Sequence, residues 1–192
     1  MNSQMTPIVK NLLIINVLFY MAQFAFPATE YYLSLWPLGS GEFKLYQLIT
    51  TGFLHSTRDI WHLGMNMFEL WMFGKFLENV LGSKKFLTLY MVSLIGASLL
   101  HIALSNSRAI GASGAVMGVL IGFALLFPNM KLFLLFFPFP IKAKYLAMGL
   151  AALDIIGGFT SYESGIAHFA HLGGMITAVI LIKLIWKIPK IL

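Results

Sequence analysis

The sequence predicts an all-α membrane protein whose six transmembrane helices form one bundle. Of its 192 residues, 59% are hydrophobic and only 10% are charged, and the mean hydropathy is +0.84. A soluble domain of this length would need a more polar surface. Apolar stretches recur along the whole chain without a repeat, a low-complexity tract or a second domain. We therefore expect a single polytopic membrane domain over residues 1–192.

Six apolar stretches approach the length of about 20 helical residues that spans a hydrocarbon core of about 30 Å. The first is too long for the core of a signal peptide and has no convincing cleavage site, so we expect it to be retained. Breaker residues and charges set the limits of the others. The expected helices cover about residues 8–27, 61–81, 85–104, 113–128, 142–159 and 168–187.

The less regular stretches carry their own expectations. The fourth helix is short and ends at the breaker pair Pro128-Asn129. The stretch Leu132–Pro140 is apolar but contains two prolines, so we interpret it as an interfacial connector, with a re-entrant segment as the alternative. The longest connection, about residues 28–60, is rich in aromatic side chains, which favours a partly membrane-embedded structure over a free linker.

Basic residues predict the orientation in the membrane, since six spans place both termini on one side. Ten basic residues fall on the side of the termini and three on the opposite side. We therefore expect cytoplasmic termini and a multi-pass protein of the plasma (inner) membrane. The ten are Lys10, Lys75, Lys84, Lys85, Lys131, Lys142, Lys144, Lys183, Lys187 and Lys190, and the three are Lys44, Arg58 and Arg108.

Composition also excludes several kinds of chemistry. The chain has no cysteine, which excludes thiol catalysis, disulfides and thiolate metal sites. Its net charge of +6 is spread thinly, without the basic run and interleaved aromatics of a nucleic-acid groove. We expect no cofactor, no metal and no nucleic-acid partner, and the oligomeric state stays open.

Polar side chains lie at the outer ends of three expected helices. His62 and Asn66 occupy the first turns of the second helix, Ser113 opens the fourth, and His171 lies in the first turn of the sixth. These helices run in the same direction, so the four side chains should lie about 5–10 Å below the outer interface. Polar groups are costly in a bilayer unless they meet each other or water. A shared, water-filled site is therefore predicted.

The residue types favour nucleophilic catalysis. A serine hydroxyl becomes reactive when a base removes its proton, and histidine is the usual base. Ser113 stands at a helix N-terminus, where free N–H groups favour negative charge, and Gly114, Gly118 and Gly122 give that helix a small face for close packing. No acidic residue stands obviously beside His171 at this depth, so we predict a Ser–His dyad rather than a triad.

Other interpretations stay open. His62, His168 and His171 offer three nitrogens for a metal or proton site in a carrier, although no H-E-x-x-H pattern accompanies them. A non-catalytic protein that binds other transmembrane helices is also compatible with the small-residue faces. His55 and His101 we interpret as structural.

With these motifs the chain resembles the rhomboid family of intramembrane serine proteases over about residues 43–187. The resemblance implies a six-helix core, Ser113 as nucleophile and His171 as general base. It also implies an oxyanion hole formed by His62, Asn66 and the Ser113 N–H. The motifs are Phe53-Leu54-His55, His62-x-x-x-Asn66, Glu78-x-x-Leu81-Gly82-Ser83, Gly111-Ala112-Ser113-Gly114 and Ala170-His171-Leu172-Gly173-Gly174.

The resemblance further implies single-span membrane proteins as substrates, cut near the outer face of the bilayer. The fifth helix and the loop at about 157–167 would correspond to the substrate gate. Three departures concern geometry: the Trp-Arg pair frequent in the first outer loop of the family is absent, Met117 stands where an aromatic residue is frequent, and Ala178 replaces a glycine. His168 matches no catalytic position of the family.

Overall fold

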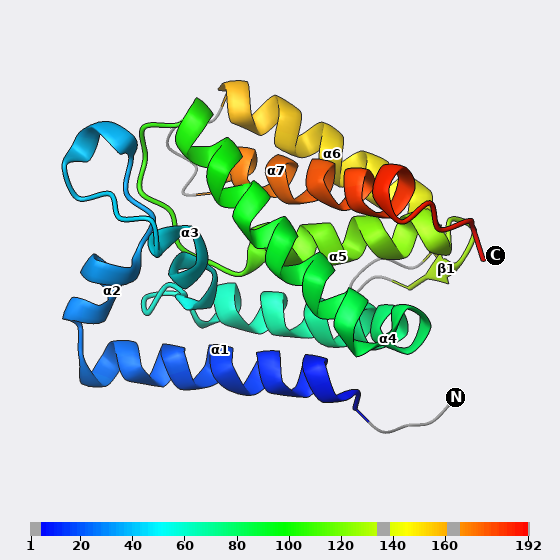
Figure 1. Cartoon of the computed structure of the whole chain (residues 1–192), viewed down its shortest axis with the longest axis horizontal. Coiled ribbons are helices and arrows are strands. Elements are labelled where there is room, and N and C mark those ends of the chain that lie inside the picture. The colour runs from blue at the N-terminus through cyan, green and yellow to red at the C-terminus, as the bar shows by residue number, and fades with distance from the viewer. Residues whose placement is uncertain (1–4, 134–138, 161–165, 192) are drawn as a thin grey trace.

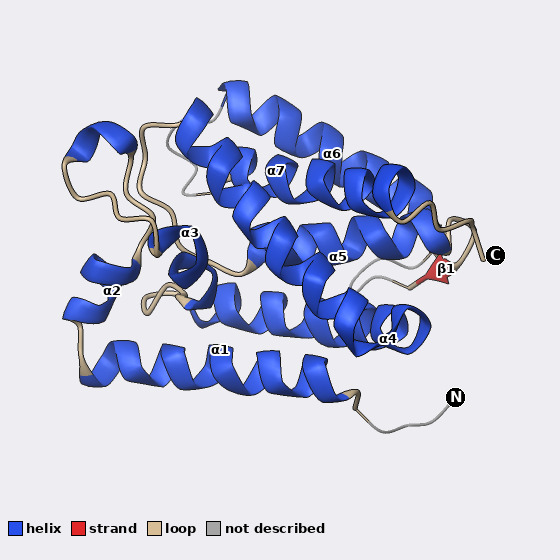
Figure 2. Cartoon of the chain, viewed as in Figure 1, coloured by secondary structure: helices blue, strands red, loops and turns tan. Residues whose placement is uncertain are grey.

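The computed structural model describes residues 5–133, 139–160 and 166–191. Most of the described chain is helical (Figures 1 and 2). The α-helices are α1 (Pro7–Ala25), α2 (Ala28–Leu33), α3 (Gln47–Thr50), α4 (Ile60–Leu104), α5 (Ser113–Leu126), α6 (Ala143–Thr160) and α7 (His168–Val179). Short 3₁₀ turns cover Leu38–Ser40 and Thr51–Phe53, and α7 continues as a π-helix over Ile180–Ile185.

The six predicted helices are all present, although two of them follow each other without a loop. The 45-residue α4 contains a sharp kink at Gly82, where φ is +76°. Glycine adopts this conformation readily because it has no Cβ. The kink divides α4 into two limbs that correspond to the predicted second and third helices (Figure 1). The prediction of a six-helix membrane bundle is therefore confirmed.

Both ends of the described chain lie at the same end of the bundle (Figure 1). We call the opposite end the outer end; it holds the connections 26–59 and 105–112. As predicted for an even number of spans, both termini therefore lie on the same side of the bundle. Which side of the membrane this is stays a prediction.

Helix α5 occupies the centre of the bundle, between α4 and α7 (Figure 1). Every residue of this helix except Ser113 and Leu125 is buried. Its 14 residues measure about 21 Å at 1.5 Å per residue, which is shorter than a hydrocarbon core of about 30 Å. A short central helix among longer neighbours places its first residue, Ser113, below the rim of the outer end.

Small residues allow α5 and α7 to approach closely, as their spacing predicts. A methyl group added at Gly174 would collide with the backbone oxygen of Gly114, and one added at Gly118 would lie 3.1 Å from the oxygen of Gly174. Side chains of ordinary size would force these helices apart. The close packing fixes the first turn of α7 against the first turn of α5.

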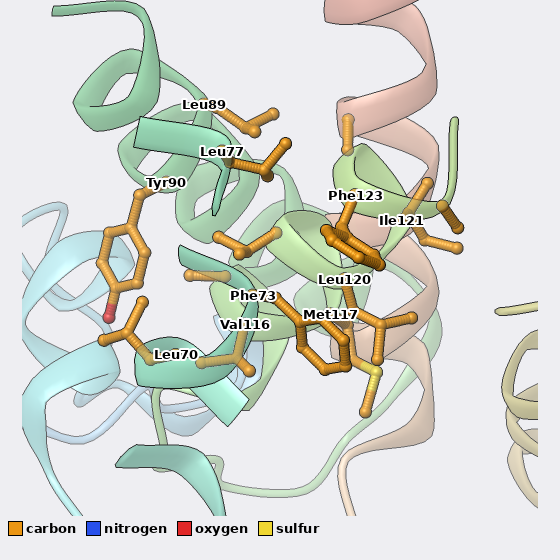
Figure 3. Close-up of a cluster of buried hydrophobic side chains, with 14 of the residues drawn as sticks. Leu70, Phe73, Leu77, Leu89, Tyr90, Val116, Met117, Leu120, Ile121 and Phe123 are labelled. Carbon is orange, nitrogen blue, oxygen red and sulfur yellow. The ribbon is translucent and has the colours of Figure 1, made fainter. Parts of the chain in front are cut away.

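A hydrophobic core of aliphatic and aromatic side chains, many of them from α4 and α5, fills the bundle (Figure 3). One carboxylate lies beside it. Glu78 accepts hydrogen bonds from the backbone N–H groups of Ile8 and Val9 at 3.0 and 2.9 Å, and from Ser83 Oγ at 2.7 Å. Glu78 thus satisfies free N–H groups in the first turn of α1 and ties α1 to α4.

The connection between α5 and α6 contains a short pair of β-strands. Strand β1 (Lys131–Leu132) pairs antiparallel with β2 (Ile141–Lys142). The middle of the predicted interfacial connector, residues 134–138, lies outside the described residues. The choice between a connector and a re-entrant segment therefore stays open.

Candidate active site

An open cavity of about 1030 Å³ lies at the outer end of the bundle, where residues of the connections 26–59 and 105–112 line it. The first turns of α4, α5 and α7 all contribute to its walls, together with the connections at the rim. All four site residues predicted from the sequence line this one cavity: His62, Asn66, Ser113 and His171. The structure thus brings the polar groups of three helices to one open cavity, whereas their roles in a reaction stay predictions.

Ser113 and His171 are in direct contact. The hydroxyl Oγ of Ser113 lies 2.8 Å from Nε2 of His171, a normal length for a hydrogen bond. Ser113 is the first residue of α5 and His171 lies in the first turn of α7, so the close approach of these two helices produces the contact.

A third residue completes a chain of hydrogen bonds. Asp154 Oδ1 lies 2.9 Å from Nδ1 of His171, and only 8% of the Asp154 side chain is exposed. The expectation that no acidic residue stands beside His171 is therefore wrong. The cause is the direction of α6: it runs towards the outer end, so Asp154, six residues before its end at Thr160, reaches the depth of the first turn of α7.

The carboxylate of Asp154 also serves a second imidazole. His168 Nδ1 lies 2.8 Å from the same Oδ1 atom, so one oxygen joins two rings that stand one helical turn apart. Gly157 on α6 makes room for the His168 ring, since a Cβ at position 157 would lie 2.5 Å from its Cε1 and Nε2 atoms. No catalytic role was predicted for His168 from the sequence. In the structure this residue lies behind Asp154 rather than beside Ser113.

His62 stands on the other side of Ser113, and its hydrogen bond defines its neutral tautomer. The backbone N–H of Ser56 donates to Nδ1 of His62 at 3.1 Å, so a neutral ring carries its proton on Nε2. Gly111 lies between this Nε2 and Ser113: a Cβ on Gly111 would fall 2.8 Å from His62 Nε2 and 3.7 Å from Ser113 Oγ. Gly111 has a φ of +127°, so a side chain here would be strained as well as obstructed.

Asn66 lies one turn below His62 and is 6% exposed. Its Nδ2 donates one hydrogen bond to the carbonyl of His62 at 2.7 Å. An amide NH₂ has two protons, so the second remains for an acceptor inside the cavity. The i to i−4 bond holds the amide against its own helix and orients this second proton.

The first outer connection fixes the backbone that leads to Ser113. Leu35 and Ala109 exchange both backbone hydrogen bonds at 3.0 Å, Gly111 N–H donates to the carbonyl of Thr51 at 3.0 Å, and Thr51 Oγ1 donates to the carbonyl of Ala109 at 2.7 Å. The long connection is thus a structured support rather than a free linker, as its composition predicted.

Other side chains of the cavity had no predicted role in the chemistry. Glu69 on α4 lines its wall, as does Met117 on α5. At the rim, Arg108 forms an ion pair with Glu30 at 2.8 Å, and its guanidinium lies 5.3 Å from the ring centre of Trp36. A tryptophan and an arginine therefore meet here from two separate segments. Part of the expected gate, residues 161–165, lies outside the described residues.

His55 and His101 have the structural surroundings that the sequence analysis predicted. His55 is fully buried, and its backbone N–H and carbonyl pair with the side-chain amide of Gln23 at 3.0 and 2.8 Å. Burial, with a smaller effect of nearby His62, lowers the pKa of His55 to about 3. His101 Nε2 contacts the carbonyl of Ser107 at 2.9 Å, which holds the end of α4.

Comparison with known proteins shows which family the sequence matches. The family model of the Rhomboid domain matches residues 42–188. The chain is 37% identical over 140 residues to Rhomboid protein 1, mitochondrial, of Saccharomyces cerevisiae, covering 69% of this chain and 40% of that protein. It is 33% identical over 156 residues to RHOMBOID-like protein 12, mitochondrial, of Arabidopsis thaliana, covering 71% and 45%.

A mammalian relative shows the same partial coverage. The human Presenilin-associated rhomboid-like protein, mitochondrial, is 28% identical over 138 residues, which cover 67% of this chain and 36% of that protein. The chain thus spans less than half the length of these three relatives.

Proposed function

Because this chain belongs to the rhomboid family, we propose that it is an intramembrane serine endopeptidase. The observation that carries the proposal is the 2.8 Å contact between Ser113 Oγ and His171 Nε2 inside a cavity open to the outer end. Within a bundle in which four helices are long and apolar enough to cross a membrane, such a pair supports acyl transfer on a substrate that reaches it within the bilayer.

The first chemical step uses the hydrogen-bond chain that ends at Asp154. Its carboxylate accepts the Nδ1 proton of His171, which leaves Nε2 as the acceptor facing Ser113. His171 removes the hydroxyl proton while Oγ attacks the scissile carbonyl carbon, and a tetrahedral intermediate forms. His171 then gives this proton to the leaving amine, the C–N bond breaks, and an acyl ester remains on Ser113. Asp154 acts as a positioning residue that holds the required tautomer.

The developing oxyanion needs donors that are already in place. Three groups around Ser113 qualify: its own backbone N–H at the start of α5, the Nε2 proton of His62 and the second amide proton of Asn66. In the surroundings of low dielectric constant, each of these hydrogen bonds is stronger than it would be in water.

Water completes the cycle. The cavity is lined by polar as well as apolar groups and opens at the rim near Arg58 and Arg108, so water can reach the ester. His171 removes a proton from this water, the hydroxide attacks the acyl carbon, and the proton returns to Ser113 Oγ as the ester bond breaks. The products are a new carboxyl terminus and a free enzyme.

We propose single-span membrane proteins as substrates, because the cavity lies among helices long and apolar enough to cross a membrane, where another transmembrane segment can approach it. A substrate helix must unwind locally, since its helical amides are already hydrogen-bonded and shielded. The chain is a multi-pass integral membrane protein. The three relatives above are named as mitochondrial, and these names favour a mitochondrial membrane over the plasma membrane that the sequence analysis expected.

A fluorophosphonate probe tests the nucleophile directly. The purified protein in detergent should react at Ser113, and labelling should be lost in Ser113→Ala and His171→Ala. Ser93→Ala and His101→Ala are matched controls, because both side chains are buried outside the cavity. Without Ser113 or His171, turnover of a transmembrane substrate should fall by about 10⁶-fold. Undiminished labelling of Ser113→Ala, or no labelling of any variant, would favour a non-catalytic helix-binding protein.

A further inference from the structure

We propose that Asp154, His168 and His171 form a binding site for one Zn²⁺ ion, and that the bound zinc switches off the serine centre. The inhibitory half of this proposal rests on the proposed function, whereas the binding half does not. The observation behind it is that one carboxylate oxygen and two imidazole nitrogens all lie within 4.8 Å of one another.

The ligand set and its dimensions suit zinc. Two neutral imidazoles and one carboxylate form a common three-ligand set for zinc, with water at the fourth position. Ligand atoms about 2.0–2.1 Å from a tetrahedral ion lie about 3.3 Å from each other. The two Nδ1 atoms lie 2.8 and 2.9 Å from Asp154 Oδ1, so each of these pairs must open by about half an ångström to admit the ion. The two imidazole nitrogens lie within 4.8 Å of each other, so this pair must close by at most about 1.5 Å. Imidazole nitrogen also favours zinc over calcium or magnesium, which prefer oxygen.

The site is supported and accessible. Gly157 packs against the His168 ring on the side of Cε1 and Nε2, which holds Nδ1 towards Asp154. The three side chains are 8%, 13% and 12% exposed for Asp154, His168 and His171, so none of them is sealed from the solvent. His171 lines the open cavity, and an ion can approach from there.

Zinc at Nδ1 would inhibit through the tautomer of His171. A neutral imidazole carries one proton, and coordination of Nδ1 moves this proton to Nε2. Nε2 then donates towards Ser113 Oγ and no longer accepts its proton, so the serine loses its base. Zinc also takes the carboxylate that held the opposite tautomer. Removal of the metal restores both hydrogen bonds, which makes the inhibition reversible.

The binding half is tested on Ser113→Ala protein, in which catalysis plays no part. Co²⁺, used as the spectroscopic probe, should give one saturable visible band, and Zn²⁺ should displace it at one ion per chain. His168→Gln in this background should weaken binding by more than about 100-fold, since loss of a group that only orients a ligand already costs about 10–100-fold. His62→Ala should leave binding unchanged. Loss of binding in His62→Ala, or no effect of His168→Gln, would overturn the proposed ligand set.

Two glycines on α6 provide a test that keeps every ligand. Gly157→Ala should weaken Co²⁺ binding because its methyl group displaces the His168 ring. Gly149→Ala is the matched control, because nothing lies within 4 Å of a Cβ at that position. Equal binding in both variants would contradict the proposed support of His168.

The inhibitory half is tested on the wild-type protein through the rate of fluorophosphonate labelling. Zn²⁺ should slow this labelling at least 10-fold, EDTA should restore it, and His168→Gln should label at nearly the same rate with and without zinc. Zinc that binds without slowing the labelling would overturn the switch. A wild-type protein that never labels would instead count against the serine protease function, while the Co²⁺ experiment would still decide the metal site.

Discussion

Two carboxylates inside the bundle, Glu78 near its inner end and Asp154 near its outer end, have nearly the same burial and different partners. Glu78 is 3% exposed and Asp154 is 6% exposed. Glu78 accepts hydrogen bonds from two backbone N–H groups and one serine hydroxyl. Asp154 accepts from two imidazole rings.

The difference teaches how to interpret an acidic residue in a membrane helix. Such a residue is expensive to bury and suggests a function by default, yet the chemistry depends on its donors. Backbone N–H groups do not exchange protons in a reaction, so Glu78 ties two helices together. Imidazoles can move a proton, so Asp154 is able to control which nitrogen of His171 is free. Substitutions at the two positions should therefore separate stability from activity.

The largest contrast is expected for Asp154→Asn, which keeps the size of the side chain and removes its charge. His171 would lose the acceptor that selects its tautomer, and kcat should fall by up to about 10⁴-fold. The midpoint of thermal unfolding in detergent should change little, and the rate of fluorophosphonate labelling should fall with kcat. Asp154→Glu should recover part of both rates. Full activity in Asp154→Asn would show that the serine and histidine act as a dyad.

The next largest effect is expected for Asn66→Ala, which removes one proposed donor to the oxyanion. Loss of such a donor lowers kcat by about 10²–10³-fold. Asn16→Ala is a matched control, because Asn16 is also buried and its Nδ2 also donates to the carbonyl four residues earlier, at 2.7 Å. Steady-state kinetics on one transmembrane substrate should show the loss only in Asn66→Ala. Equal losses in both variants would indicate a structural role for Asn66.

Glu78→Gln should show the opposite behaviour to Asp154→Asn. An amide retains one acceptor oxygen and presents N–H groups to the N–H groups of α1, so at least one buried donor loses its partner. Such a loss costs about 1–3 kcal/mol of stability, which denaturant unfolding in mixed micelles measures. The folded fraction should keep its kcat. A fall in kcat without a loss of stability would mean that Glu78 also supports the active site.

The sequence predicted much of this arrangement because its main signals are local. Lengths of apolar stretches gave the six helices, and the small residues at Gly114, Gly118 and Gly174 indicated which helices meet. The four polar residues that line the cavity followed from one rule, that helices running in the same direction start at the same depth. The end of α5 at Leu126 rather than near residue 128 is a difference of two residues, at the breaker pair that was expected to end it.

Asp154 was missed because depths were compared only among the helices that run from the outer end to the inner end. Residues near the C-terminal end of an outward-running helix reach the depth of N-terminal residues in its neighbours, and one aspartate in an otherwise apolar stretch was the available signal. The hydrogen bonds of Thr51 and of Leu35 to the segment before Ser113 carry no comparable signal. They depend on how a long connection folds back, which periodicity does not encode.

The last effect, the pH dependence of stability, extends the comparison to a buried group without hydrogen bonds from its ring. Neither ring nitrogen of His55 has a partner among the described residues, and burial lowers its pKa to about 3, against about 6.5 in the unfolded chain. The folded state therefore binds fewer protons than the unfolded state between these values. Stability should be fully present above pH 6.5 and decline as the pH falls towards 3, by up to about 1.4 kcal/mol per pH unit. The pH dependence of thermal unfolding measures this decline, and it should be shallower in His55→Leu. Identical slopes in the two proteins would show that other groups cause the acid sensitivity and that a buried, unpaired imidazole here costs nothing to protonate.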